Sequence, residues 1–128
     1  MFPGATADRP DANYAIVGAP LDASTSFEPG ARFGPDRVRH YASGFENYDH
    51  RTDRQFTDFG VYDHGDIGPT ADTTEYLEYL RTTLESFVDT GTLPLVIGGE
   101  HTVSVAGVRA TDPDVFVSLD AHLDLRTE

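Results

Sequence analysis

Cysteine and lysine are both absent from the 128 residues of the sequence. Without cysteine, the chain has no disulfides, no thiolate nucleophile and no thiolate metal ligand. No apolar run approaches the roughly 18 residues that are needed to cross a bilayer, and the N-terminal residues show no signal-peptide pattern. These absences predict a soluble, cytoplasmic chain.

Charge of one sign dominates the sequence. Asp and Glu number 22 against nine basic residues, all of them arginine, so the formal net charge is −13. Nucleic acids and anionic membrane surfaces would repel such a chain, and we expect neither as a partner. The acidic excess suits either an ordinary acidic protein or a surface adapted to high salt, where dense carboxylates hold water and their repulsion is screened. We favour the halophilic interpretation.

The chain is long enough for one domain at most. Short apolar runs bounded by Gly, Pro and polar residues predict buried strands, and runs with capping signals or helical spacing predict helices. The predicted strands are 14–18, 61–67, 93–97 and 115–119, and the predicted helices are 34–43, 73–89 and 101–110. This alternation predicts the α/β class, with a mostly parallel sheet covered by helices on both faces.

The clearest predicted helix is 73–89. Asp72 can cap its N-terminus, Glu75 follows three residues later, and Gly91 lies just beyond its end. An apolar stripe at helical spacing predicts the face that packs in the core, namely Leu77, Leu80, Leu84 and Phe87. Residues 45–58 are polar and aromatic without a period, and no element is predicted there.

Two polar motifs follow directly on predicted strands. Residues 98–101 are Gly-Gly-Glu-His, after the strand 93–97, and residues 120–124 are Asp-Ala-His-Leu-Asp, after the strand 115–119. A helical crossover between the two strands makes them parallel. Ligand sites of such sheets lie beyond the carboxyl ends of the strands, so we expect both motifs at one edge of the sheet.

The spacing of the second motif predicts a metal site. In an extended chain the side chains at i, i+2 and i+4 face the same way, which brings Asp120, His122 and Asp124 together. Such groups resist desolvation unless a cation holds them, and His101 can arrive from the neighbouring strand end. Imidazole and carboxylate ligands without sulfur suit Mn²⁺ first, and then Mg²⁺, Fe²⁺ or Zn²⁺. The alternative is that the two aspartates cap a following helix and that His122 is structural.

These two motifs resemble those of the agmatinase and arginase family, the manganese ureohydrolases, which carry G-G-[DE]-H-[ST] and then D-A-H-x-D. Three further segments are similar to the family: 17–22 (VGAPLD), 27–35 (FEPGARFGP) and 63–66 (DHGD), the last resembling its D-x-G-D. The resemblance covers residues 13–126 in order. The Leu-Arg pair after the second motif favours agmatinases over arginases.

The resemblance implies an arginase-like fold, a three-layer α/β/α sandwich, and a pair of Mn²⁺ ions. By position, His101, Asp120 and Asp124 would bind one ion, and Asp120 and His122 the other, with Asp120 bridging the two. Glu100 is not a ligand in this scheme and would orient His101 or its backbone. The implied reaction is hydrolysis of a guanidino group, with agmatine giving putrescine and urea as in polyamine biosynthesis; the ions lower the pKa of bound water.

Members of the family extend beyond this motif. A later S-x-D-x-D motif supplies two more aspartates, and a proton-shuttling histidine and an acidic residue for the guanidinium also lie further on. None of these follows Asp124, because the sequence stops at Glu128. We therefore expect residues 1–128 to be the N-terminal portion of a single ureohydrolase domain. A sheet cut in this way would expose an apolar edge and self-associate at low salt.

Several alternatives stay open at this point. Arginase, guanidinobutyrase and formimidoylglutamase activities are alternatives within the family. A non-catalytic truncated fragment, which binds metal or a partner without turnover, is the alternative from a different class. The partners implied by the resemblance are a small cationic guanidino substrate and, for the complete protein, further copies of itself. The sequence assigns no catalytic and no substrate-binding residue, and His64 is interpreted as a structural loop histidine.

Overall fold

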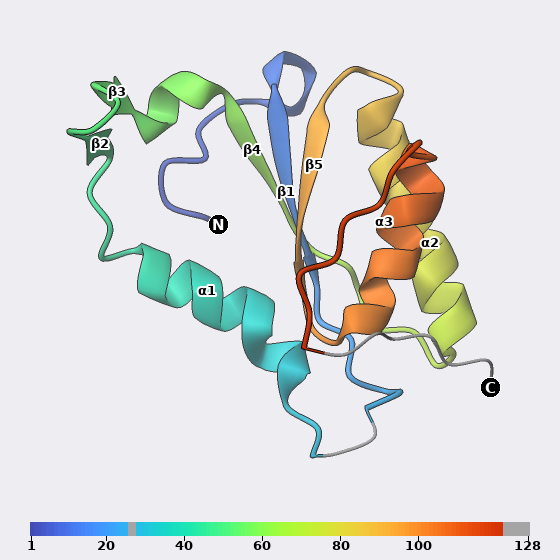
Figure 1. Cartoon of the computed structure of the whole chain (residues 1–128). Helices are drawn as coiled ribbons and strands as arrows, with labels where there is room; N and C mark the ends of the chain where they lie inside the picture. Colours follow the sequence, from blue (N-terminus) through green and yellow to red (C-terminus); the bar gives the residue numbers. More distant parts are fainter. Residues whose placement is uncertain (26–27, 122–128) are drawn as a thin grey trace.

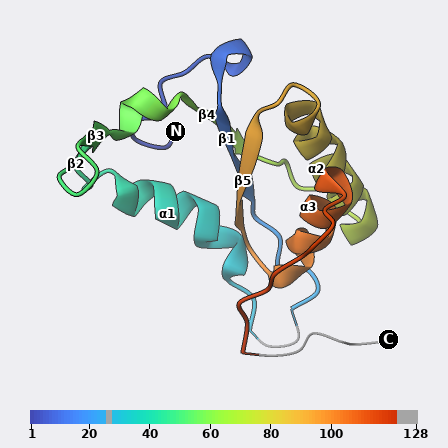
Figure 2. The same ribbon diagram turned by 45° about the horizontal axis from the view of Figure 1, so that its top comes forward.

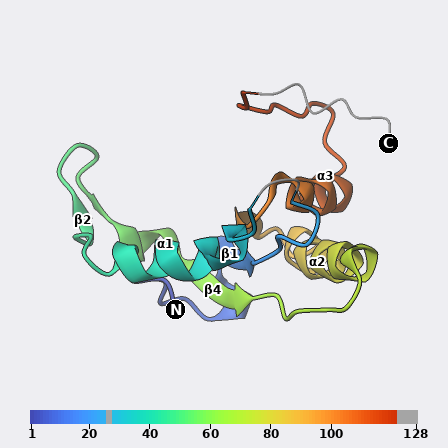
Figure 3. The same ribbon diagram turned by 90° about the horizontal axis from the view of Figure 1, so that it is seen from below.

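The structure, a computed structural model, describes residues 1–25 and 28–121. Its centre is a parallel three-stranded sheet in the order β4-β1-β5 (Figure 1). The elements that build the domain are β1 (Tyr14–Ala19), α1 (Gly34–Ala42), β4 (Val61–Asp66), α2 (Thr73–Val88), β5 (Leu93–Gly98) and α3 (Ser104–Thr111). Helix α1 lies on one face of the sheet, and α2 and α3 lie together on the other (Figures 2 and 3). The predicted parallel sheet between helices is confirmed.

The bounds of these elements agree with the predicted ones to within a few residues. One short 3-10 helix, Arg9–Asp11, precedes β1, and three others lie between the later elements: Ala31–Phe33, Phe56–Phe59 and His101–Val103. The helix that was predicted to begin at residue 101 therefore starts as the 3-10 helix His101–Val103 and continues as α3. Residues 45–58, where no element was predicted, contain a small antiparallel pair, β2 (Tyr48–Asp49) and β3 (Arg54–Gln55).

The larger core lies between the sheet and helices α2 and α3. Asp72 caps α2 as predicted, since its side chain accepts a hydrogen bond from the backbone N–H of Glu75 at 3.0 Å. Three of the four predicted stripe residues are fully buried, and Tyr76 joins them where Leu77 is only partly buried. The buried residues of α2 are therefore Tyr76, Leu80, Leu84 and Phe87. They share one core cluster with Ala15, Val17 and Ala19 of the buried strand β1.

A smaller apolar cluster covers the opposite face of the sheet. It contains Ala5, Ile16 and Val61, with partly buried aromatic residues of the N-terminal segment and of residues 56–59 packed against it. The N-terminal segment is tied to the start of β4, because the backbone N–H of Ala7 donates to the carbonyl of Val61 at 3.0 Å. These contacts explain why the polar lead-in to β1 is ordered along the sheet.

The prediction of a buried strand at residues 115–119 is wrong for this structure. The segment has no strand partner within the described residues and is exposed, with Val117 at 74% and Leu119 at 98%. A strand needs a neighbouring strand for its backbone N–H and C=O groups, and an apolar strand also needs cover on both faces. Neither is supplied to this segment by residues 1–25 and 28–121. An apolar run indicates a tendency to be buried but does not provide the surface that buries it.

None of the helices in the described part of the chain has the length and apolar character that crossing a bilayer requires.

Candidate functional site

The loops that follow β1 and β5 are joined at the carboxyl edge of the sheet. The backbone N–H of Gly99 donates to the carbonyl of Ala19, and the N–H of Glu100 donates to the carbonyl of Leu21, both at 2.8 Å. A Cβ atom on Gly99 would lie 2.0 Å from the Leu21 carbonyl oxygen, so this approach requires glycine. The Gly-Gly pair of the first motif therefore lets two loops run side by side at the predicted edge.

The two sequence motifs meet at this edge. His101 begins the 3-10 helix after β5, and its Nδ1 lies 3.3 Å from Oδ2 of Asp120. The two side chains remain 43% and 29% exposed, so both are accessible from solvent. The structure thus brings together two of the four predicted metal ligands, one from the segment before helix α3 and one from the segment after it.

The other two predicted ligands, His122 and Asp124, lie outside the described residues. Within residues 1–25 and 28–121, no group of three His, Cys, Asp or Glu side chains is arranged to hold a metal ion. The four-ligand set therefore stays a prediction. The pair that can be examined, an imidazole and a carboxylate without sulfur, has the donor chemistry that Mn²⁺ takes in proteins.

Glu100 does not turn toward His101, as the sequence had suggested, but toward the loop after β1. Its carboxylate accepts hydrogen bonds from the backbone N–H of Ser24 at 3.2 Å and from the Thr25 hydroxyl at 3.0 Å. The Ser24 hydroxyl donates to the same carboxylate and lies 3.1 Å from the Thr102 hydroxyl. Sequence reasoning missed these contacts, because the partners lie about 75 residues apart.

The loop after β1 has a second anchor at Asp22. Its Oδ2 accepts from the backbone N–H of Gly30 and from Nε of Arg32, both at 2.8 Å. Burial disfavours the charged carboxylate, but the hydrogen bonds from Arg32 and Gly30 outweigh it and hold the pKa of Asp22 below its ordinary value. The side chain of Arg32 is thus paired with an aspartate of its own loop.

The two aspartates of the Asp-His-Gly-Asp segment, at the end of β4, bind an arginine of helix α1. Arg39 of α1 donates to both oxygens of Asp63, at 2.8 and 2.9 Å, and to Asp66 at 2.5 Å. Burial opposes ionisation of Asp63, but the hydrogen bonds from Arg39 and two backbone N–H groups hold the pKa of Asp63 below its usual range. A Cβ atom on Gly18 would lie 1.8 Å from the Asp66 carboxylate, so only glycine leaves room for this contact.

His64 of the same segment lies on the core side of β4. Its ring packs edge-on against Phe87 of α2, with the centroids 5.6 Å apart, and burial lowers the pKa of His64. Its Nδ1 is buried and has no hydrogen-bond partner in the described part of the chain. His64 therefore has a structural environment, but it lies in strand β4 and packs on the core, and not in a loop as predicted from the sequence.

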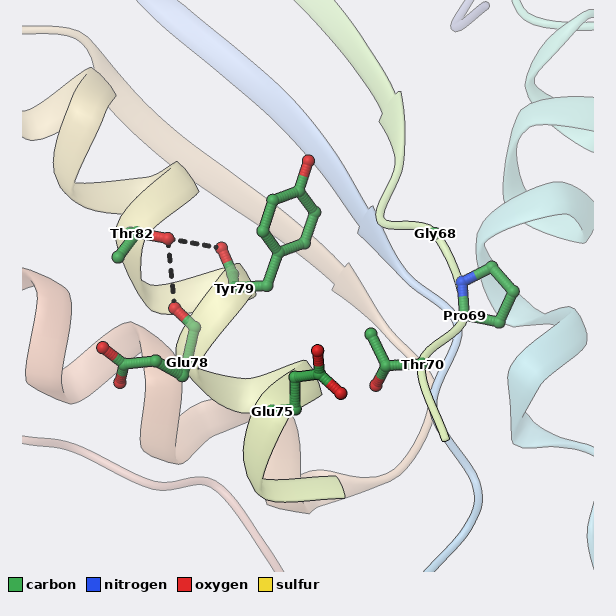
Figure 4. A pocket seen from close by; sticks show the side chains of 7 residues that line it. All are labelled: Gly68, Pro69, Thr70, Glu75, Glu78, Tyr79 and Thr82. Atoms are coloured by element: carbon green, nitrogen blue, oxygen red, sulfur yellow. Dashed lines mark hydrogen bonds between the residues drawn. The ribbon is translucent and has the colours of Figure 1, made fainter. Parts of the chain in front are cut away.

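A cavity of about 670 Å³ opens beside the meeting point of the motifs. Its lining includes Ser24 and Thr25 of the loop after β1, Glu100 and His101 of the loop after β5, and Phe116. A separate hollow of about 490 Å³ lies between the loop after β4 and helix α2, lined by residues 68–70 and by side chains of the helix that include Glu75 and Tyr79 (Figure 4). It shares no residue with the cavity at His101.

Residues 12–128 match the sequence pattern of the arginase family. The chain belongs to that family. Agmatinase from Pyrococcus horikoshii is 34% identical over 123 residues, which is 94% of this chain and 44% of that relative. The arginase-family chain thus spans less than half the length of this curated relative.

Solved structures of the arginase family share the fold. The agmatine ureohydrolase of Thermoplasma volcanium superposes with a TM-score of 0.81 at 26% identity, covering 85% of this chain and 37% of that one. Trypanosoma cruzi formiminoglutamase, solved with Mn²⁺, superposes with a TM-score of 0.73 at 26% identity, covering 82% of this chain and 36% of that one. The described sheet and helices therefore have the arginase-like architecture.

Proposed function

We propose that this chain carries part of a manganese-dependent ureohydrolase site that hydrolyses agmatine to putrescine and urea. The observation that carries the proposal is the approach of His101 Nδ1 and Asp120 Oδ2 to 3.3 Å, at the carboxyl edge of the sheet. Family membership and the agmatinase from Pyrococcus horikoshii support the choice of reaction. Because the chain spans 44% of that relative, the activity of the whole protein is part of the proposal.

The donor chemistry fits the proposed metal. His101 and Asp120 would hold Mn²⁺, and His122 and Asp124 are proposed to complete the ligand set. When bound, the ions supply a water of lowered pKa and stabilise negative charge near the reacting carbon. The chain's own residues hold the ligand pair in place, since the N–H groups of Gly99 and Glu100 fix the loop immediately before His101.

The charge of the chain suits the proposed substrate. Agmatine carries a guanidinium and an ammonium group, and a net charge of −13 attracts small cations while it repels polyanions. The cavity of about 670 Å³ beside His101 lies within the usual range of small-molecule pockets, about 300–1,000 Å³. We therefore propose a small guanidino cation as the partner, in the cytoplasm and with further copies of the protein in a homo-oligomer.

Metal binding is the first test of this function. The Mn²⁺ affinity of the chain is measured by calorimetric titration. His101→Ala and Asp120→Asn should each lower this affinity by about tenfold or more. Asp114→Asn is the matched control, because Asp114 is an exposed aspartate six residues before Asp120. Equal Mn²⁺ affinity in Asp120→Asn and Asp114→Asn would refute the assigned ligands.

Turnover is the second test. Urea release with added Mn²⁺ is measured for agmatine and, in parallel, for arginine, guanidinobutyrate and formimidoylglutamate. Preference for agmatine, lost in Asp120→Asn and kept in Asp114→Asn, is the expected result. Formimidoylglutamate hydrolysis is the second candidate, because the Trypanosoma cruzi formiminoglutamase shares the fold at a TM-score of 0.73. Binding of Mn²⁺ without turnover of any of the four would favour a non-catalytic metal-binding module instead.

A further inference from the structure

The side chain before His101 connects two loops that are distant in sequence. Backbone hydrogen bonds already hold residues 19–21 against residues 99–100. Beyond them, the Glu100 carboxylate is the next point of contact, and it takes three donors from Ser24 and Thr25. Hydrogen bonds to an ionised acceptor are about twice as strong as those between neutral groups. Glu100 therefore fixes the part of the β1 loop that the backbone bonds do not reach.

The contacts of Glu100 separate it from the neighbouring ligand pair. Its two oxygens point to the β1 loop, while His101 points to Asp120. The anchor at Asp22 holds a different part of the same loop, residues 30–32, so removing Glu100 leaves that anchor intact. Ser24 and Thr25 both donate to Glu100, and both line the cavity beside His101.

We propose that Glu100 is a positioning residue, which fixes Ser24 and Thr25 in the wall of the substrate cavity beside His101. This inference rests on the proposed function for the identity of the substrate, a small guanidino cation. A wall that moves by about 1 Å changes how a bound substrate is aligned and can lower turnover by about a hundredfold. Glu100 would thus act on the substrate through the loop and not through the metal.

Hydrogen exchange measured by mass spectrometry tests the inference directly. In Glu100→Ala, the amides of residues 21–25 should exchange about tenfold faster than in the parent chain, because a charged acceptor is lost. Glu100→Gln, which keeps the shape and one acceptor, should show a smaller increase. Exchange within α2, Thr73–Val88, should not change. Glu46→Gln is the matched control, because Glu46 is exposed and lies away from the loop.

Metal affinity and kinetics separate a positioning role from a ligand role. Glu100→Ala should keep its Mn²⁺ affinity within about twofold, unlike His101→Ala. With agmatine as substrate, its kcat should fall by more than its KM rises, because a displaced wall misaligns the bound substrate. Unchanged exchange of residues 21–25 would overturn the inference, and so would a loss of Mn²⁺ binding as large as that of His101→Ala.

Two outcomes of these experiments need a measurement of their own: a parent chain that releases no urea, and a Glu100→Ala variant that does not fold. If the parent chain releases no urea, the proposed function fails, while hydrogen exchange and Mn²⁺ affinity still decide the role of Glu100. If Glu100→Ala does not fold, Ser24→Ala with Thr25→Val removes the two hydroxyl donors to Glu100 and leaves the backbone N–H of Ser24. That double variant should still raise the exchange of residues 21–25 above that of the parent chain. Exchange equal to that of the parent chain would again overturn the inference.

Discussion

The face of the sheet under α2 and α3 and the outer edge of β5 are covered very differently. Under the helices, Leu80, Leu84 and Phe87 have no exposed surface. On the outer strand, Leu95 is 45% exposed, and the apolar segment at 115–119 beyond α3 is more exposed still. Residues of the same chemical type are thus buried in one region and open to solvent in the other, within about 35 residues of sequence.

The difference shows what a helix and a strand each need in order to bury their apolar side chains. An amphipathic helix carries a single apolar stripe, which one neighbouring sheet can bury. An apolar strand needs a paired neighbour at each edge and packing on both faces. Strand β1 has β4 and β5 beside it and helices on either side, whereas β5 has a neighbour only at β1 among the described residues. The closed face and the open edge of β5 should therefore respond differently to the same substitution.

A matched pair of leucine substitutions should show the largest difference. Leu84→Ala removes a fully buried side chain from the core and should lower the free energy of unfolding by about 3–5 kcal/mol. Leu95→Ala, on the half-exposed outer strand, should lower it by less than about 1 kcal/mol. Urea unfolding followed by circular dichroism measures both. Equal losses would mean that the β5 edge is as well packed as the core.

Loss of the Arg39 contacts should have the next largest effect. Arg39 is 10% exposed and links α1 to Asp63 and Asp66 of β4, so Arg39→Met removes the guanidinium that both carboxylates share. The free energy of unfolding should fall by about 2–3 kcal/mol, because Asp63 keeps two backbone donors. Arg37→Met, in the same helix but exposed, is the control for the same urea measurement. A loss no larger than in this control would show that the ion pair does not hold α1.

Low pH should weaken the contact between Asp63 and Arg39 and should lower the free energy of unfolding by less than Arg39→Met does. The folded-state pKa of Asp63 lies below its unfolded value, so its contribution is complete above about pH 4 and is lost as the pH falls through the lower, folded value. The free energy of unfolding should therefore decrease on acidification below about pH 4. Asp63→Asn should be less stable at pH 7 and show a shallower decrease. Parallel pH profiles would contradict the role of Asp63.

The smallest effect on stability, with the clearest effect on association, is expected at the open edge. Leu95→Lys places a charge on the outer strand and should change the free energy of unfolding by less than about 1 kcal/mol, while it reduces self-association. Sedimentation velocity in dilute buffer compares it with Tyr41→Lys, an exposed apolar position on α1. A parent chain that sediments as a single monomer would show that the exposed edge does not drive association.

Much of the fold could be predicted because the deciding signals are local. Asp72 and Glu75 define the start of α2, and the spacing of Leu80, Leu84 and Phe87 defines its buried face. The replacement of Leu77 by Tyr76 in the core could not be predicted, since it depends on how the helix is rotated against the sheet. The prediction of a strand at 115–119 was wrong for a related reason. Its apolar residues indicated burial, but a strand forms only where a neighbouring strand pairs with its backbone.

The candidate site was predictable to the same extent. The motif spacing indicated that His101 and Asp120 would meet, and the structure places them 3.3 Å apart. The roles of Arg39 and Glu100 were not predictable, because each side chain finds its partners on a loop or strand between 24 and 76 residues away. No local pattern fixes which way such a side chain turns.

The sequence by itself determined the absence of thiol chemistry, the acidic charge, the alternation of strands and helices from β1 to α3 apart from the β2–β3 pair, and the residue types of the proposed metal site. These follow from composition and from the short-range periodicity of apolar residues. Only the tertiary structure decided that Glu100 holds the β1 loop, that Asp63 and Asp66 bind Arg39, and that the apolar segment after α3 stays exposed. Hydrogen bonds and burial depend on which surfaces meet, and that is a property of the folded chain as a whole.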